Sequence, residues 1–411
     1  MPGKTDISRD LAFLDGKRAA MTARLRDWCA INSGSRNLEG LALMRAALAE
    51  AFAPLGGEIE TVPSAKESLV TAQGEIRLCE IGASFRLVKR PSAPVRLLLA
   101  GHMDTVFPAD HPFQKDKLLD ADTLNAPGGA DMKSGLLIML FALMALEQSR
   151  VADRIGYEVV VNADEEIGSP GSAGLIEAAA RRAHFACVYE PAMADGALAG
   201  ARKGSGNFSA IFGGVGAHAG REHHLGRNAL VAAAEFATRI DRLTGAREGL
   251  TVNVARIEGG GANNVVPDMA VLRFNARVEK PEDAAFLLEK ARALIEEIGA
   301  REGYGAVLHG GFARPPKVMT PALARFFETL KALGAELGLR LAWQATGGCC
   351  DGNNIAAAGI PVIDTLGARG AHIHSADEIV KLDSLEERAK LSALLFLRVA
   401  AGDIENPGLA A

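Results

Sequence analysis

Four hydrophobic segments of this chain each lead into a residue that can bind a metal ion. Imidazole and carboxylate side chains are usual zinc ligands. In open α/β sheets, ligands gather beyond the carboxyl ends of the strands, so the pattern predicts a metal-dependent active site at that edge. The side chains that follow segments 95–100, 157–161, 186–189 and 360–363 are, in order, His102, the triplet Asp164-Glu165-Glu166, Glu190, and the pair His372 and His374.

The first of these motifs is Gly101-His102-Met103-Asp104. Side chains two residues apart on an extended backbone point to the same face. His102 can therefore bind a metal through one ring nitrogen while Asp104 accepts a hydrogen bond from the other nitrogen and fixes the ring. The alternative is a histidine that has a polar partner and no metal.

Another candidate ligand, Asp131, lies in the glycine-rich segment 128–135. Glycines let the backbone approach a ligand closely, and the two oxygens of Asp131 can bridge two cations. The alternative is an aspartate near a helix N-terminus, where it satisfies free N–H groups and the helix dipole.

The triplet Asp164-Glu165-Glu166 places three carboxylates in a row. Adjacent like charges repel one another, so a solvated turn is the alternative. Because the triplet follows an apolar strand, we expect one glutamate to bind metal and the other to act as a general base. The spacing does not distinguish Glu165 from Glu166 in these two roles.

The elements that must position these side chains alternate between strands and helices, which favours an α/β fold. Apolar residues that repeat at i, i+3 and i+4 predict helices over 11–31, 38–52, 133–148 and 173–182. The apolar stretch 136–146 is shorter than the roughly 20 residues that cross a bilayer. We therefore expect it to be a buried helix.

The pattern changes after Pro191, where strands, turns and two helices indicate an α+β insert. We therefore expect a catalytic domain made of residues 1–200 and 316–411, interrupted by a smaller domain at 201–315. The insert is expected to contain strands at 207–212, 252–257 and 269–278, a short strand at 306–310, and helices at 228–242 and 281–302.

Composition limits the possible partners. The chain has 411 residues, with 45 Lys and Arg against 50 Asp and Glu, which gives a net charge of −5. Surfaces that bind nucleic acid are usually basic, so we expect no nucleic-acid partner. The five scattered cysteines include no CxxC pair and indicate a reducing compartment. The polar N-terminus has no apolar signal region. We expect a cytoplasmic protein without a membrane partner.

Taken together, the motifs resemble those of the co-catalytic zinc aminoacylase/carboxypeptidase family, which includes acetylornithine deacetylase, succinyl-diaminopimelate desuccinylase and bacterial glutamate carboxypeptidase. The resemblance covers nearly the whole chain. It is carried by Gly101-His102-Met103-Asp104-Thr105-Val106, Gly129-Ala130-Asp131-Met132-Lys133-Ser134-Gly135, Asp164-Glu165-Glu166-Ile167-Gly168-Ser169, Glu190-Pro191, Ala217-His218-Ala219-Gly220, Asn264-Val265-Val266-Pro267, Gly347-Gly348 with Asp351, Gly367, and His374 in His-Ser-x-x-Glu.

The resemblance implies a zinc-peptidase-like catalytic domain, with a mostly parallel sheet flanked by helices, and an inserted lid at 201–315 that also forms a homodimer. It implies two zinc ions, although sites of mixed carboxylate and imidazole ligands also accept cobalt or manganese. The implied roles are His102 and Glu190 on one ion, Glu166 and His374 on the other, Asp131 as the bridge, Glu165 as the general base, and Asp104 as the residue that orients His102.

The resemblance also assigns substrate contacts. It implies that His218 reaches the active site of a neighbouring subunit and stabilises the oxyanion of the reaction there. Asn264, Arg277 and Arg314, with Gly348, resemble positions that hold a substrate, and arginine suits a carboxylate through bidentate contact. Where many relatives carry a small residue and then Thr or Ser, this chain has Cys349-Cys350. We expect these cysteines to pack and not to bind metal.

The implied activity is two-metal hydrolysis of an amide or peptide bond in an N-acyl amino acid or at a C-terminal residue, as in glutamate carboxypeptidase. A deacylase of the acetylornithine or succinyl-diaminopimelate type is the alternative. Two other classes stay open. One is a catalytically silent homologue. The other is a nucleotide-binding oxidoreductase, because Gly214-x-Gly216-x-x-Ala219 matches the dinucleotide fingerprint.

Overall fold

A six-stranded sheet carries the sequence segments that end in candidate ligands. The structure, a computed structural model, describes residues 4–408. Strands β8, β5, β9 and β16 run parallel, and β4 and β1 add antiparallel neighbours at one edge. In sheet order the strands are β1 (Glu58–Val62), β4 (Ser84–Lys89), β8 (Ile155–Asn162), β5 (Val95–His102), β9 (Phe185–Val188) and β16 (Val362–Ile363). The mostly parallel α/β sheet is as predicted.

Helices cover both faces of this sheet, which explains why its parallel strands are largely apolar. Along β5, Leu97 and Leu99 join the larger hydrophobic core, whereas Leu98 and Ala100 join a smaller core on the opposite face. The larger core is covered by α2 (Arg18–Cys29), α3 (Leu38–Phe52), α4 (Ser134–Glu147), α8 (Pro321–Glu336) and α10 (Asp383–Ala401); the smaller one is covered by α5 (Ala173–Ala180) and α9 (Asp351–Ala357).

Helix α4 contains the apolar stretch that we expected to be buried, and the structure confirms this. Together with the turn before it, the helix spans Gly129–Glu147 and is long and apolar enough to cross a membrane. However, 89% of its most apolar window is buried inside the protein. It is therefore a core helix, packed against α10.

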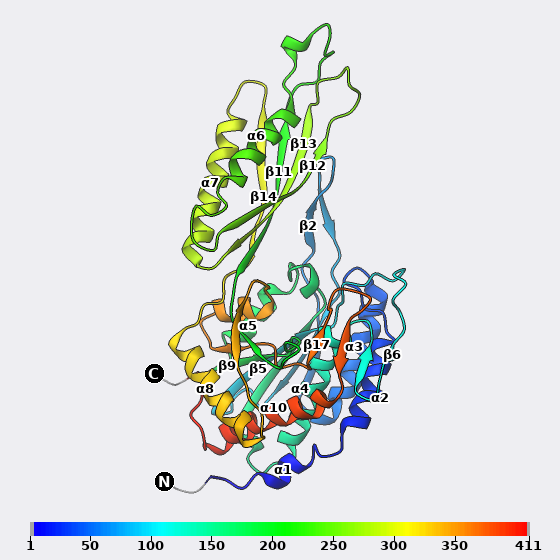
Figure 1. Ribbon diagram of the computed structural model, residues 1–411, viewed down its shortest axis with the longest axis vertical. Helices are drawn as coiled ribbons and strands as arrows, with labels where there is room; N and C mark the ends of the chain where they lie inside the picture. Colours follow the sequence, from blue (N-terminus) through cyan, green and yellow to red (C-terminus); the bar gives the residue numbers. More distant parts are fainter. Residues whose placement is uncertain (1–3, 409–411) are drawn as a thin grey trace.

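A second, antiparallel sheet forms the upper part of the molecule (Figure 1). Its order is β12 (Thr251–Gly259), β13 (Met269–Val278), β11 (Gly204–Gly213) and β14 (Gly305–Arg314). Helices α6 (Ala229–Asp241) and α7 (Pro281–Gly299) cover one face and enclose a separate hydrophobic core. We use the name lid for residues 201–315. The domain boundaries remain a prediction, which the separate core supports.

The other face of the lid sheet meets a hairpin that rises from the catalytic part (Figure 1). The hairpin consists of β2 (Glu67–Val70) and β3 (Ile76–Cys79). Arg273 Nη2 donates to the carbonyl of Val70 over 2.9 Å, and His309 Nε2 lies 3.3 Å from the carbonyl of Ser68. The lid is thus braced by contacts that its two chain connections do not provide.

The remaining elements are short. They comprise α1 (Ser8–Ala12), the parallel pair β10 (Leu198–Arg202) and β15 (Trp343–Thr346), and a small sheet of β17 (Gly370–Ala371), β18 (Ile379–Lys381), β7 (Thr123–Asn125) and β6 (Lys117–Leu118). Single 3₁₀ or π turns lie at η1 (Ala53–Leu55), η2 (Gly129–Lys133), η3 (Ala152–Arg154), η4 (Glu165–Ile167) and η5 (His223–Leu225).

Three sequence-based expectations need correction. The helix predicted over 11–31 is broken between α1 and α2 by a turn in which Gly16 has φ +71°, a conformation open to glycine. The short strand predicted at 306–310 is the ten-residue β14. The dinucleotide interpretation is wrong, because Gly214 leaves an antiparallel strand for a loop and the next α-helix, α6, begins only at Ala229. The fingerprint requires a helix at that point.

Helix α4 packs closely against the strand ends at Gly135. A Cβ at this position would lie 1.9 Å from the carbonyl oxygen of Tyr189. We expect Gly135→Ala to lower the thermal unfolding midpoint by several degrees, since overpacking costs about 1–3 kcal/mol. Gly174, near the start of α5, has no atom within 4 Å of its added Cβ. Gly174→Ala should leave the midpoint unchanged or raise it; equal losses in both variants would contradict the packing argument.

Candidate metal centre

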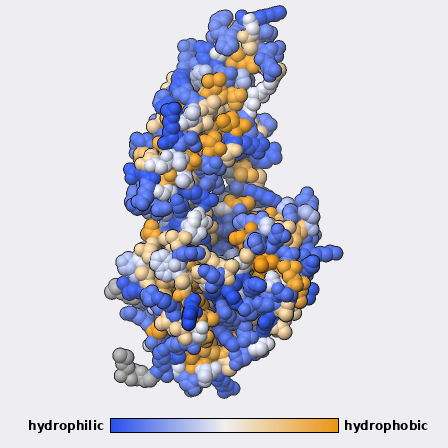
Figure 2. Space-filling model, viewed as in Figure 1, coloured by the Kyte–Doolittle hydropathy of each residue, from blue (hydrophilic) through white to orange (hydrophobic). Residues whose placement is uncertain are grey.

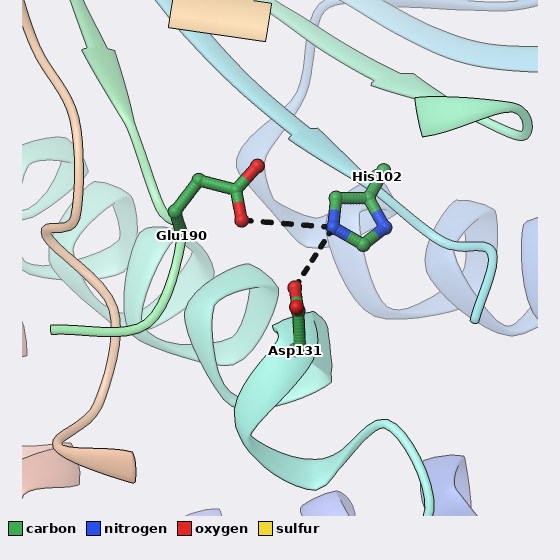
Figure 3. A group of neighbouring side chains, drawn as sticks. All are labelled: His102, Asp131 and Glu190. Atoms are coloured by element: carbon green, nitrogen blue, oxygen red, sulfur yellow. Dashed lines mark hydrogen bonds and ion pairs between the residues drawn. The ribbon is translucent and has the colours of Figure 1, made fainter. Parts of the chain in front are cut away.

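Five side chains from five separate segments meet at the carboxyl edge of the parallel strands. His102 ends β5, and Glu190 follows β9 by two residues (Figure 3). Asp131 lies in the π turn η2 before α4, and Glu166 lies in the 3₁₀ turn η4 after β8. His374 belongs to the loop between β17 and β18. The topology therefore gathers residues that are up to 272 positions apart, from 102 to 374.

The five side chains form two groups that share Asp131. In the first, His102 Nε2 lies 3.1 Å from Asp131 Oδ1 and 3.8 Å from Glu190 Oε2 (Figure 3). In the second, His374 Nε2 lies 3.2 Å from Asp131 Oδ2 and 3.2 Å from Glu166 Oε2. Each carboxylate oxygen of Asp131 thus faces one group. The structure brings together all five residues expected to bind metal, with the grouping that the family resemblance implied.

The spacing and burial of these atoms fit divalent cations. Two atoms bound to a tetrahedral zinc ion at about 2.0–2.1 Å lie roughly 3.3 Å from each other, close to the separations seen here. Glu190 Oε1 is buried and has no hydrogen-bond partner among the described residues. Buried polar atoms are normally partnered, so an acceptor left in this position suits a bound cation.

The electrostatics point the same way. Burial, followed by repulsion from Asp131, raises the pKa of Glu166 to about 7. Burial also raises the pKa of Glu190. Burial alone would raise the pKa of Asp131, but hydrogen bonds from His102 and His374 outweigh it and hold that pKa below its usual range. The protein thus compensates the charge of Asp131 but not fully those of Glu166 and Glu190, and positive ions favour the charged form of carboxylates.

Asp104 holds the turn that carries the two glutamates. Its carboxylate accepts backbone N–H groups from Glu165 (3.1 Å) and Glu166 (3.2 Å), and the hydroxyl of Ser35 (2.7 Å). His102 Nδ1 lies 3.0 Å from the backbone carbonyl of Asp104 and 3.4 Å from its carboxylate. The predicted contact between Asp104 and His102 therefore exists, but the shorter of the two distances is to the main-chain oxygen of Asp104.

Glu165 lies beside both groups and belongs to neither. Its Oε1 accepts a hydrogen bond from Arg314 Nη2 over 2.7 Å. Arg314 also donates to Asp351, Ser169 and Asn354. The prediction that Arg314 binds a substrate carboxylate needs correction in this structure, because the buried guanidinium already serves these protein acceptors.

Arg277 is placed differently. It projects from the open face of the lid sheet, where Nη1 lies 3.2 Å from Cys349 Sγ and Nε donates to Asn275 Oδ1 over 3.1 Å. Among the described residues, no carboxylate forms an ion pair with it. Cys349 and Gly348 line a cleft of about 330 Å³ that also contains the metal-ligand groups. Arg277 is therefore a cation at the rim of this cleft, and it has N–H groups without a hydrogen-bond partner among the described residues.

Asn264 and His218 do not reach this cleft within one chain. Arg277 pairs with Thr251 at one end of β12, whereas Asn264 lies beyond Gly259 at the other end. A nine-residue strand is roughly 27 Å long. His218 pairs with Val265 at the same far end and is exposed. Asn264 and Arg277 of one chain therefore do not lie close enough to hold the same carboxylate, and their substrate contacts stay a prediction.

The structure adds cleft residues that the sequence argument missed. Arg202 lines the cleft and forms a bidentate contact with Asp364 at 2.8 and 3.1 Å, and Lys317 contacts the same carboxylate at 2.9 Å. Asp364 directly follows β16, so the rule that identified the other strand-end acids applies to it as well. Cys350 is buried and accepts the backbone N–H of Gly352 at the start of α9, which agrees with a packing role.

Comparison with known proteins places these features in a family. A family model described as "Peptidase family M20/M25/M40" matches residues 98–398. Carboxypeptidase G2 from Pseudomonas sp. (strain RS-16) is 31% identical over 322 residues, which are 74% of this chain and 74% of that protein. Succinyl-diaminopimelate desuccinylase from Bordetella petrii is 28% identical over 318 residues, 72% of this chain and 81% of that protein.

Solved structures share the fold. A tripeptidase from Staphylococcus aureus superimposes with a TM-score of 0.71 at 23% identity, covering 94% of this chain and 99% of that one. A metallo-carboxypeptidase from Sulfolobus solfataricus gives 0.67 at 18% identity, covering 93% and 99%. Since the family model spans most of the sequence and the two ligand groups lie where the strands end, the chain belongs to the metallopeptidase family M20/M25/M40 and is a metal-dependent hydrolase of amide or peptide bonds.

Proposed function

We propose that this hydrolase releases an amino acid with a free carboxylate by cleaving the peptide or N-acyl amide bond on its amino side. The observation that carries the proposal is the position of Arg277, a cation without an acidic partner, at the rim of the cleft that holds both ligand groups. The similarity to a carboxypeptidase and to desuccinylases supports this class of substrate. A narrower second candidate is a deacylase of the acetylornithine or succinyl-diaminopimelate type, because desuccinylases recur among the relatives.

Two zinc ions are the proposed cofactors. His102 with Glu190 would hold one, His374 with Glu166 would hold the other, and Asp131 belongs to both groups. Such paired cations would lower the pKa of a water molecule and polarise the scissile carbonyl. The protein's own contribution is to fix the ligands: Asp104 holds the backbone of Glu165 and Glu166, and it contacts the ring nitrogen of His102 that faces away from Asp131.

Glu165 is the proposed general base and acid. Glu166 contacts His374 within a ligand group, whereas Glu165 stands outside both groups and still lines the cleft. Arg314 positions the Glu165 carboxylate, and Asp351 in turn holds Arg314. Because a charged partner holds it, the Glu165 carboxylate keeps a fixed orientation relative to the scissile bond, as general base catalysis requires.

Arg277 is the proposed carboxylate anchor, with the backbone of Gly348 as a second contact on the cleft wall. Arg202 and Arg314 are less suited, because each is buried and already paired with an aspartate. An arginine with free N–H groups can bind a carboxylate through two parallel hydrogen bonds. Asn264 is assigned instead, together with His218, to the cleft of a second subunit.

The proposed assembly is a homodimer formed through the lid. His218 and Asn264 lie together at the far end of the lid, away from their own cleft. The sheet edges β12 and β14 have no further strand beside them in the described chain, and open edges favour pairing. Hydrophobic residues gather on the surface of the lid (Figure 2). Its exposed apolar side chains are Val215, Leu225, Val231, Ile257, Val265 and Val307.

The substrate class is tested with N-acyl amino acids and dipeptides, each compared with the same compound in which the C-terminal carboxylate is replaced by a carboxamide. We expect the carboxylate forms to be preferred, and Arg277→Gln to reduce kcat/KM for them by about 10- to 150-fold, the value of a charged hydrogen bond, with little change for the carboxamides. Arg256→Gln, an exposed arginine of β12, is the control. Equal losses on both forms would contradict the anchor, and metal-loaded protein that cleaves no substrate would support the silent homologue.

The roles of the two glutamates are separated by measuring turnover and metal content together. Wild-type protein should bind two divalent ions per chain, lose activity on chelation and regain it with added zinc. Glu165→Gln should retain both ions and lose about 10²–10⁴-fold in turnover, because an amide cannot accept the proton. Glu166→Gln should lose metal. The opposite pattern would mean that the two roles are exchanged.

The shared active site predicts complementation between two inactive variants. His218→Ala should fold, dimerise and bind both metals, yet lose about 10²–10³-fold in turnover, the value of one oxyanion donor. Mixing it with Glu165→Gln should restore part of the activity, since some mixed dimers contain one intact composite site. A mixture that stays inactive after verified subunit exchange, or a fully active monomer in light scattering, would contradict the arrangement.

A further inference from the structure

Glu378 is a buried carboxylate that the proposed reaction does not use. It is 1% exposed and lies four residues after His374, outside the residues that line the cleft. Its oxygens accept three backbone N–H groups, from Gly128 (3.1 Å), Ala130 (2.9 Å) and Asp131 (3.1 Å). One side chain thus binds the main chain of the loop that presents the shared metal ligand.

The loop needs such a partner. Gly128, Ala130 and Asp131 lie at the N-terminal end of the helical segment that begins with η2, where N–H groups have no acceptor within the helix. A buried N–H without a partner costs about as much as a lost hydrogen bond. Glu378 supplies acceptors for two consecutive donors with one oxygen, and for Gly128 with the other.

Glu378 is itself anchored from the opposite side. The Asn125 side chain donates to the carbonyls of Ala376 (3.0 Å) and Glu378 (2.8 Å), and Asn125 pairs with Ile379 between β7 and β18. The segment from His374 to Glu378 is therefore fixed to the same small sheet. It carries one metal ligand at its start and the support of a second ligand at its end.

We propose that Glu378 is a positioning residue, which holds the backbone of Asp131 so that its two oxygens face the two ligand groups, and which fixes the spacing between Asp131 and His374. The proposal rests on the two-metal centre proposed above. Residues that support metal ligands from outside the coordination sphere typically contribute about 10- to 100-fold to metal affinity or activity. The effect of Glu378 should be seen in metal binding before any substrate is added.

The test measures zinc binding to metal-free protein by competition with a chromophoric chelator, and the visible spectrum of the cobalt-substituted protein, which reports ligand geometry. Glu378→Gln keeps the size of the side chain but presents an amide N–H where an acceptor is needed. We expect a loss in zinc affinity of about 10- to 100-fold, an altered cobalt spectrum, and partial recovery of kcat in excess zinc. Asp377→Asn removes the same charge from an exposed neighbour and should match wild type.

Wild-type zinc affinity and an unchanged cobalt spectrum in folded Glu378→Gln would overturn the proposal and leave Glu378 a purely structural role. If that variant fails to fold, Glu378→Asp, which keeps the charge and withdraws it by one methylene, is measured in the same way. Wild-type values for it would overturn the proposal equally. Failure of the wild-type protein to bind two ions would refute the two-metal centre itself, a distinct result from two ions bound equally by wild type and variant.

Discussion

The crowding of carboxylates at one edge of the sheet is the constraint around which the catalytic part is built. Asp131, Glu165, Glu166 and Glu190 line a single cleft, and burial together with mutual repulsion raises the pKa of Glu166 and Glu190. Such an arrangement is stable only if positive charge enters it. The parallel strands bring the acids together, and the two histidines and the metal ions that we infer compensate them.

A second set of buried acids shows the contrast. Asp104, Asp164, Asp351 and Asp364 lie just behind the cleft, and each is satisfied by the protein: Asp104 and Asp164 mainly by backbone N–H and serine donors, and Asp351 and Asp364 by arginine or lysine. Among the acids at the front, Glu165 has such a donor in Arg314, whereas Asp131, Glu166 and Glu190 face only His102 or His374 among the described residues. Glu190 Oε1 has no partner there. The carboxylates without arginine, lysine, serine or backbone donors are thus the three of the ligand groups, a distinction that needs no reference to any relative.

The sequence alone carried much of this, for a physical reason. A buried strand is apolar along its length, so a polar residue at its end stands out, and this identified His102, the triplet Asp164-Glu165-Glu166 and Glu190. The same reasoning recognised the apolar segment 360–363 but passed over Asp364, the residue directly after it, because the metal-ligand types sought there were the nearby histidines. Helical periodicity did not reveal the break at Gly16, since the apolar pattern continues across it. The three-dimensional partners of a side chain were the least predictable feature. Arg314 was expected to hold substrate, but its N–H groups already donate to protein acceptors. Asn264 lies a full strand length away from Arg277.

The hairpin beneath the lid has a mechanical consequence. The two chain connections of the lid lie side by side, since Ser205 pairs with Arg314. Two adjacent connections would by themselves allow the lid to rotate about the line through them. The contacts of Val70 with Arg273 and of Ser68 with His309 lie away from that line and oppose such a rotation. Breaking the two hydrogen bonds would cost about 1–3 kcal/mol in total, so they resist rotation of the lid only weakly.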